Sequence, residues 1–309
     1  MNATTKFAGF TLGLAAVFGI AFATGALVGP EPSGPAAHDI AHDAGTEANT
    51  ESPIPGGTLA TAGGYTLSLE NAQLPAAPDT PLRFRIVNDS GVALTDYTPS
   101  HEKELHLIVV RRDMSAFQHV HPTREADGTW STPLDLTRAG DYRVFADFVP
   151  AGGENLTLGA DLRVAGAYDP QPLPPPTATA TVGDYTVTLD GAITPGTASK
   201  VTLTVSRGGT PVTDLEPYLG AYGHLVALRA TDLAYLHVHP EGHPGDGVTA
   251  PGPGVTFYVT APSAGDYRLF LDFQHGGTVR TAEFTVSAAS DGTRQTTDDH
   301  TESTPGHGH

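Results

Sequence analysis

The sequence predicts an all-β fold of two tandem antiparallel β-sandwich domains that follow an N-terminal apolar helix. Short stretches in which apolar and polar residues alternate recur along the chain between turn residues, which is typical of strands. After the N-terminus, no segment has the length and periodicity of an ordinary helix. The second half of the chain also repeats the first, so we expect one fold twice.

Each half contains about seven strand-like stretches in roughly 110 residues, which suits a sandwich of the immunoglobulin or cupredoxin-like type. In the first half they are Gly64–Glu70, Pro81–Asn88, Leu105–Val110, Phe117–His121, Thr129–Leu136, Asp141–Phe148 and Leu156–Val164.

The repeat is clearest in two stretches. Asp184–Asp190 echoes Gly64–Glu70, and Gly265–Phe273 echoes Gly140–Phe148. The second pair begins Gly-Asp-Tyr-Arg in both copies. We expect this tyrosine to lie in the core with its hydroxyl bonded to nearby backbone, as in a tyrosine corner.

Composition divides the chain into six segments. Apolar, Pro/Gly-rich and polar stretches separate the two repeats from what surrounds them. The predicted segments are a signal anchor or signal peptide (1–28), a flexible tether (29–56), the first sandwich (57–167), a Pro-rich linker (168–177), the second sandwich (178–288) and a polar His-containing tail (289–309).

The N-terminal apolar run, Phe7–Val28, has 22 residues without charge. A secretory core is usually about 7–15 residues, whereas a spanning helix needs about 20, so length favours an uncleaved anchor. Ala21–Ala23 is a small-residue cleavage site that keeps a cleaved signal as the alternative. Lys6 before the run predicts that the rest is extracytoplasmic. We therefore expect a single-pass protein of the cell membrane or, alternatively, a secreted one.

Charge and cysteine content exclude several classes of function. The 309 residues carry a net charge of −18, with 16% charged residues and no cysteine. A nucleic-acid partner is not expected, because binding one needs clustered positive charge. Without cysteine, the chain has no thiolate ligands, disulfides or cysteine nucleophile.

A pattern of three histidines occurs twice without a gap, and 118 residues separate each histidine from its counterpart. Each copy has one histidine in a strand-like stretch, followed by His-x-His-Pro in the next stretch. The candidate metal ligands are His106, His119 and His121 in the first domain and His224, His237 and His239 in the second.

The strands predict how these histidines meet. A four-residue loop at Arg111–Met114 is expected to join two antiparallel strands and to place His106 directly opposite His119. His121 lies two residues beyond His119 and shares its face. Opposed Cβ atoms lie about 4.5–5.5 Å apart, close enough for three imidazoles to bind one metal. The second copy repeats this geometry around Arg229–Asp232. The rival hypothesis is that the duplicated histidines are structural and bond to backbone or carboxylates.

Extracytoplasmic β-sandwiches behind an apolar N-terminus, each with such a histidine hairpin, resemble bacterial copper-handling domains of the YtkA-like and cupredoxin-like kind. The likeness covers both predicted domains and rests on architecture and on the six histidines. Carriers of Cu(I) of this kind usually supply methionines, whereas here Met114 is the only methionine besides the initiator. A blue-copper centre needs a cysteine, which is absent. The resemblance therefore implies an all-imidazole site for Cu(II) or Zn(II).

These features predict a membrane-tethered extracytoplasmic protein that buffers, transports or delivers Cu(II) or Zn(II). A metal transporter or another envelope protein is the expected partner. The alternative is a non-metal Ig-like adhesion or interaction module of the cell envelope. An enzyme is not expected, because no nucleophile, phosphate-binding or dinucleotide motif is present. Asp147 and Asp272, in matched strands, are candidates for outer partners of the histidines.

Overall fold

The computed structural model describes residues 54–289 except residue 237, and of His239 it describes the backbone alone. The described residues all belong to one compact unit, Glu51–His309. The predicted apolar helix at 1–28, most of the tether at 29–56 and most of the tail at 289–309 lie outside the described residues. Within 54–289 every regular element is a strand, and no helix there is long and apolar enough to cross a membrane.

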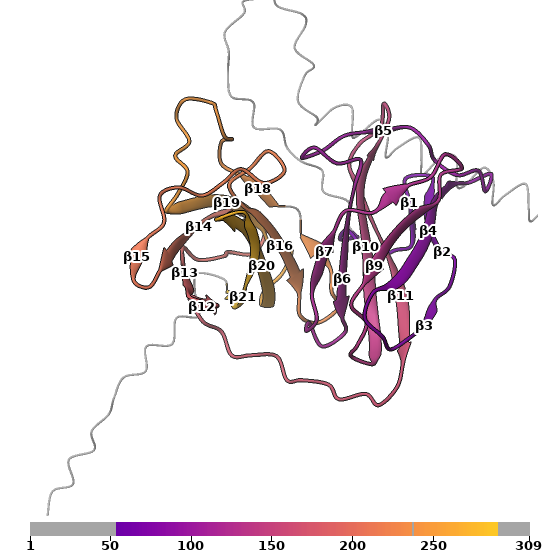
Figure 1. Ribbon diagram of the computed structural model, residues 1–309, viewed down its shortest axis with the longest axis horizontal. Helices are drawn as coiled ribbons and strands as arrows, with labels where there is room; N and C mark the ends of the chain where they lie inside the picture. The colour runs from indigo at the N-terminus through magenta and orange to yellow at the C-terminus, as the bar shows by residue number, and fades with distance from the viewer. Residues whose placement is uncertain (1–53, 237, 290–309) are drawn as a thin grey trace, which may run out of the picture. The chain divides into compact units, whose positions relative to one another are not determined.

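The chain folds into two tandem β-sandwiches, as predicted, and the first is coloured from indigo to pink in Figure 1. Its first sheet holds, in spatial order, β1 (Thr61–Ala62), β2 (Tyr65–Leu69), β4 (Thr80–Asn88), β9 (Trp130–Leu134) and β8 (Thr123–Arg124). Its second sheet holds β3 (Gln73–Pro75), β11 (Leu156–Ala165), β10 (Gly140–Pro150), β6 (Leu105–Arg111) and β7 (Gln118–Val120), with β5 (Tyr97–Thr98) paired to β10. The described pairings of this sandwich are antiparallel except that of β3 with β11, which is parallel.

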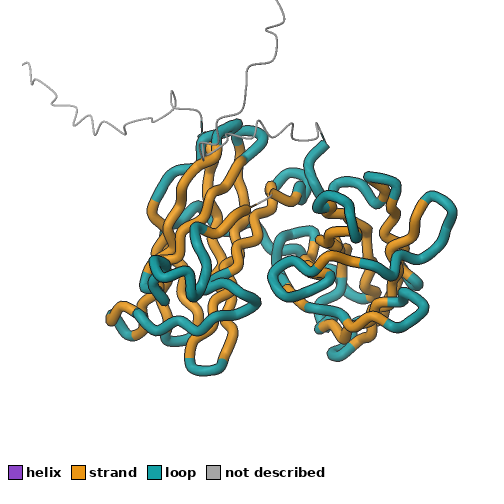
Figure 2. Tube along the Cα trace, turned by 90° about the horizontal axis from the view of Figure 1, so that it is seen from above, coloured by secondary structure: helices purple, strands orange, loops and turns teal. Residues whose placement is uncertain are grey.

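The second sandwich repeats this plan. One sheet holds β12 (Thr179–Val182), β13 (Tyr185–Asp190), β14 (Ala198–Arg207), β19 (Gly254–Thr260) and β18 (Val238–Pro240), with β15 (Thr210–Pro211) paired to β14. The other holds β17 (Tyr235–Leu236), β16 (His224–Arg229), β20 (Gly265–His275) and β21 (Thr278–Ala288). Figure 2 shows that strands and loops account for the whole described chain.

The two predicted corner tyrosines lie in the sandwich cores. Tyr142 and Tyr267 are 1% and 0% exposed. The Tyr142 hydroxyl donates to the backbone oxygen of Arg138 at 2.6 Å, and that of Tyr267 to the backbone oxygen of Ser263 at 2.7 Å. This confirms the structural role predicted for Gly-Asp-Tyr-Arg.

Strand β6 is buried on both faces, which decides where the histidines lie. β4 alternates buried and more exposed side chains, as a strand at the surface does, whereas all seven residues of β6 are buried. Leu105, Leu107 and Val109 enter the core of the first sandwich. His106 shares the opposite face with Ile108 and Val110, as the period of two requires.

That opposite face is covered by the second copy of the repeat. One apolar cluster joins both copies, with the Phe117 and Phe270 rings stacked at 3.9 Å and 6°. The matched strands β6 and β16 both contribute to it. The buried members are Ile108, Val110, Met114 and Phe145 from the first sandwich, and Val226, Leu228, Leu233 and Phe270 from the second.

The predicted register of the histidine hairpin is wrong by two residues. Ile108, and not His106, lies opposite His119, and Leu107 lies opposite Val120. The second hairpin shows the same shift, with Leu228 opposite Tyr235. The loop is longer than predicted because Met114 adopts φ 63° and Arg111 N–H donates to the Ser115 carbonyl at 3.0 Å. A shift of two leaves every side chain on its predicted face.

Candidate metal centre

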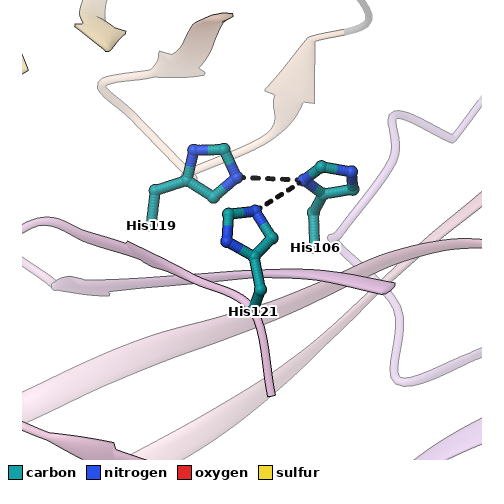
Figure 3. A group of neighbouring side chains, drawn as sticks. All are labelled: His106, His119 and His121. Atoms are coloured by element: carbon teal, nitrogen blue, oxygen red, sulfur yellow. Dashed lines mark hydrogen bonds between the residues drawn. The ribbon is translucent and has the colours of Figure 1, made fainter. Parts of the chain in front are cut away.

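Three histidines of the first sandwich gather at one point, as Figure 3 shows. His106 comes from β6, His119 from β7, and His121 from the residue after β7. One ring nitrogen of each lies within 4.8 Å of the other two. His106 Nδ1 is 3.2 Å from His119 Nε2 and 3.1 Å from His121 Nε2. Three ligands at about 2.0–2.1 Å from a tetrahedral metal would lie about 3.3 Å apart, so the rings need little movement to hold one.

Two outer contacts determine which nitrogens carry protons. His106 Nε2 lies 3.0 Å from the backbone oxygen of Ser100. Because a carbonyl only accepts, Nε2 of His106 donates and its Nδ1 keeps a lone pair. His119 Nδ1 lies 2.7 Å from Oδ2 of Asp272. The carboxylate is the acceptor there, so Nδ1 of His119 donates and its Nε2 keeps a lone pair when the ring is neutral.

These contacts aim two lone pairs at each other. His106 Nδ1 and His119 Nε2, 3.2 Å apart, both face the common point of the group. Two lone pairs at that distance repel unless a cation or a proton lies between them. The rival hypothesis of structural histidines therefore needs a proton at this point, which a neutral His121 supplies when its Nε2 donates to His106 Nδ1, 3.1 Å away; a metal there would instead bind all three rings.

Burial keeps three of the histidines neutral. Desolvation lowers the pKa of His106 to about 3 and that of His121 to about 3, and nearby histidines add to the effect. Desolvation also lowers the pKa of His224 to about 4. We call His106, His121 and His224 the low-pKa histidines. At neutral pH each keeps a free lone pair, which metal binding requires.

The second copy reproduces the described part of the site. His224 Nε2 lies 2.8 Å from the backbone oxygen of Tyr218 and donates to it, as His106 does to Ser100. His224 is 9% exposed, and its ring centroid lies 6.3 Å from that of His119. The structure therefore places His224 beside the first group. His237 and the side chain of His239 lie outside the described residues, so the second predicted group stays a prediction.

A cavity of about 310 Å³ adjoins the three-histidine group. His106, His119, His224 and Asp147 supply polar walls, and the rest is largely apolar, with Val226 and Phe257. Burial raises the pKa of Asp147 to about 6, and its Oδ1 accepts from Thr157 Oγ1 at 2.9 Å. A metal in the group would thus have a cavity with mixed polar and apolar walls beside it.

Sequence reasoning missed two parts of the site. The first is the carbonyl at Ser100, because a backbone acceptor leaves no side-chain signal. The second is His101, which also lines the cavity and whose ring centroid lies 5.2 Å from that of His224. Its counterpart in the second copy is Leu219, and both residues have positive φ, 47° and 50°. The backbone is repeated there but the histidine is not, so a search for duplicated residues passes over it.

The loop histidine His243, which follows the second motif in a longer loop, does not join the described group. It is exposed, and its Nδ1 contacts the backbone oxygen of Pro244 at 3.2 Å.

One family model matches both repeats. It is described as "Domain of unknown function (DUF8832)" and matches residues 60–166 and 180–290. No curated protein is similar to this chain.

Several solved structures are distantly similar. The Escherichia coli adhesin FdeC has 17% identity and a TM-score of 0.24, over 74% of this chain and 65% of FdeC. InvD of Yersinia pseudotuberculosis has 14% identity and a TM-score of 0.25, over 79% of this chain and 62% of that one. A tetra-tandem repeat from a large adhesion protein has 18% identity and a TM-score of 0.25, over 74% and 50%. The chain thus spans less than two thirds of each, and likenesses at this level carry no argument about function.

Proposed function

The chain belongs to the DUF8832 family, with two copies of the domain, and we propose that it is a metal-binding protein that holds Cu(II) or Zn(II) through its histidines. One observation carries the proposal. The nitrogens of His106, His119 and His121 converge within 4.8 Å, with two of the rings oriented by outer hydrogen bonds that leave their inner nitrogens as acceptors.

The donor set indicates the class of metal. Three neutral imidazoles suit Cu(II) and Zn(II), whereas softer Cu(I) favours thiolate or thioether. The chain has no cysteine, and Met114 belongs to the apolar cluster shared by the two copies. The proposed role is buffering, transport or delivery, without catalysis, in the cell envelope on an N-terminal anchor. The proposed partner is a metal transporter or another envelope protein.

The competing proposal is a non-metal Ig-like interaction module. Its support is the tandem sandwich architecture and a long loop whose Val248 is 88% exposed. Under this proposal the histidines are structural, and His121 Nε2 donates to His106 Nδ1, 3.1 Å away.

The test is titration of residues 54–288 with Zn(II) and Cu(II), followed by thermal denaturation. The duplicated motif predicts two sites in the parent and one in each of His119→Ala and His237→Ala. At a hundredfold excess over the dissociation constant, a bound metal should stabilise the folded chain by about 2.7 kcal/mol. His243→Ala is the matched control, because it removes an exposed histidine and should leave both sites intact.

Two results would contradict the metal proposal. One is a parent that binds neither ion. The other is a His119→Ala variant that binds as tightly and in the same amount as His243→Ala. Either would favour the interaction module.

A further inference from the structure

The acceptor that orients His119 comes from the other copy of the repeat. Asp272 lies on β20 of the second sandwich, and its Oδ2 accepts from His119 Nδ1 at 2.7 Å. The two side chains are only 6% and 4% exposed. The other oxygen of Asp272 accepts from Thr281 Oγ1 at 2.6 Å, which holds the carboxylate in place.

The matched carboxylate of the first sandwich does not take this role. Asp147 lies opposite His106 in the pairing of β10 with β6, and its Oδ1 accepts from Thr157. Among the described contacts, the carboxylate that orients His119 is therefore Asp272, which belongs to the second sandwich.

The apolar interface lies directly beside this hydrogen bond. Phe117 lies just before β7 and precedes His119 by two residues, and Phe270 precedes Asp272 by two on β20. In extended chain, residues two apart lie on the same side. The Phe117 and Phe270 rings are stacked at 3.9 Å. The stacked rings and the His–Asp bond are thus neighbouring contacts between the same two surfaces.

We infer that the three-histidine site of the first sandwich is completed by the second, with Asp272 as a positioning residue, so that metal binding and docking of the two copies strengthen each other. This inference rests on the proposed function. Asp272 fixes the ring and proton of His119 and leaves Nε2 free for the metal. Coupling between two equilibria is reciprocal. If docking of the two sandwiches raises the affinity for the metal by some factor, a bound metal favours the docked state by the same factor.

The first measurement is Zn(II) affinity, by competition with a chromophoric chelator, in the full chain. Loss of an outer partner of a metal-bound histidine typically costs about 10–100-fold in affinity. We expect that loss at the first site in Asp272→Ala and a smaller loss in Asp272→Asn, whose amide oxygen still accepts from His119. The matched control is Asp266→Ala. Asp266 lies on the same strand, and its Oδ1 also accepts a hydrogen bond from a hydroxyl, that of Ser287, at 2.6 Å. In the described part of the chain it is not a partner of the candidate metal-binding histidines.

The second measurement reports docking directly. The chain has no cysteine, so Val92→Cys and Val248→Cys, at sites 61% and 88% exposed, would carry the only two spin labels. We expect Zn(II) to narrow the distribution of label distances in the parent and in Asp266→Ala. In Asp272→Ala the same Zn(II) occupancy should leave the distribution unchanged.

The outcomes separate the inference from the proposed function. If the parent binds no Zn(II), both are wrong. If the parent binds and Asp272→Ala binds as tightly as Asp266→Ala, the metal site stands and its completion by the second sandwich is overturned. The coupling is also overturned if Zn(II) binds to Asp272→Ala and narrows the distribution of spin-label distances as it does in the parent. The Asn variant retains the shape of the side chain, so its partial loss distinguishes positioning from a general effect on folding.

Discussion

The apolar interface between the two copies can be tested by removing one ring, in Phe270→Ala. Phe270 is 0% exposed and lies on the face of β20 that carries Asp272. Its ring packs against Phe117 with an interplanar angle of 6°. Removing it leaves the core of each sandwich intact, because Phe270 belongs to the shared cluster and to neither sandwich core.

The expected cost follows from burial. A fully buried Phe→Ala change costs about 3–5 kcal/mol, from lost transfer energy and the cavity left behind. An aromatic pair contributes about 0.5–1.5 kcal/mol of its own. This loss should reduce the free energy with which the two copies dock, because Phe270 belongs to the cluster that they share. With a slope of about 1–3 kcal/mol per molar urea, a loss of about 3 kcal/mol moves a midpoint by about 1–3 M.

The only tryptophan, Trp130, provides the assay. It is 2% exposed in the core of the first sandwich, so its fluorescence reports unfolding of the copy that was not changed. We expect Phe270→Ala to lower the urea midpoint seen by Trp130. The control is Tyr258→Ala, an aromatic of the second sandwich that is 38% exposed, which should leave that midpoint in place. An unshifted Trp130 transition in Phe270→Ala would refute the view that docking stabilises the first sandwich.

The remaining predictions concern charge. Burial depresses the pKa of the low-pKa histidines, so below about pH 6.5 the unfolded state binds more protons and the metal-free protein loses stability toward about pH 4. The loss should be of the order of 1 kcal/mol per pH unit for each histidine. The raised pKa of Asp147 has the opposite effect, because between about pH 4 and 6 the folded state binds more protons at this carboxyl than the unfolded state does. This single group is outweighed by the three histidines. Urea midpoints measured at pH 7, 6 and 5 check the sign, and a midpoint that stays constant or rises as the pH falls would contradict the prediction. Arg111→Met should cost about 3–5 kcal/mol in thermal denaturation, because Asp113, whose side chain is 5% exposed, loses its buried guanidinium partner. A change below about 1 kcal/mol would show that Asp113 finds another partner or becomes neutral.

Much of the fold was predictable because its signals are local. Alternating stretches identify strands, and turn residues separate them. The duplication follows from matched stretches such as Gly140–Phe148 and Gly265–Phe273. The run of mostly apolar residues in β6 does not alternate with polar ones. Such a run is typical of a strand that is buried on both faces.

The hairpin register was less predictable, for a local reason. The loop after β6 uses residues with positive φ, Met114 and Ala116, at 63° and 53°. Neither is glycine or asparagine, so composition predicts a shorter turn than the chain makes. The error of two residues preserved the shared face of the histidines because side chains in a strand repeat every two residues.

The sequence by itself determined that the two repeats are all-β copies of one fold, and that His106, His119 and His121 share one face. Only the tertiary structure decided what covers that face. Asp272 is 153 residues from His119, and their contact depends on which surfaces of the two sandwiches fit each other. The alternation of residue types predicts whether a strand face is apolar or polar. Which other surface packs against that face depends on the shape of many side chains at once. The matched strands indicated Asp272 as a candidate outer partner of the histidines, but only the packing of the two sandwiches brings it to His119 of the other copy.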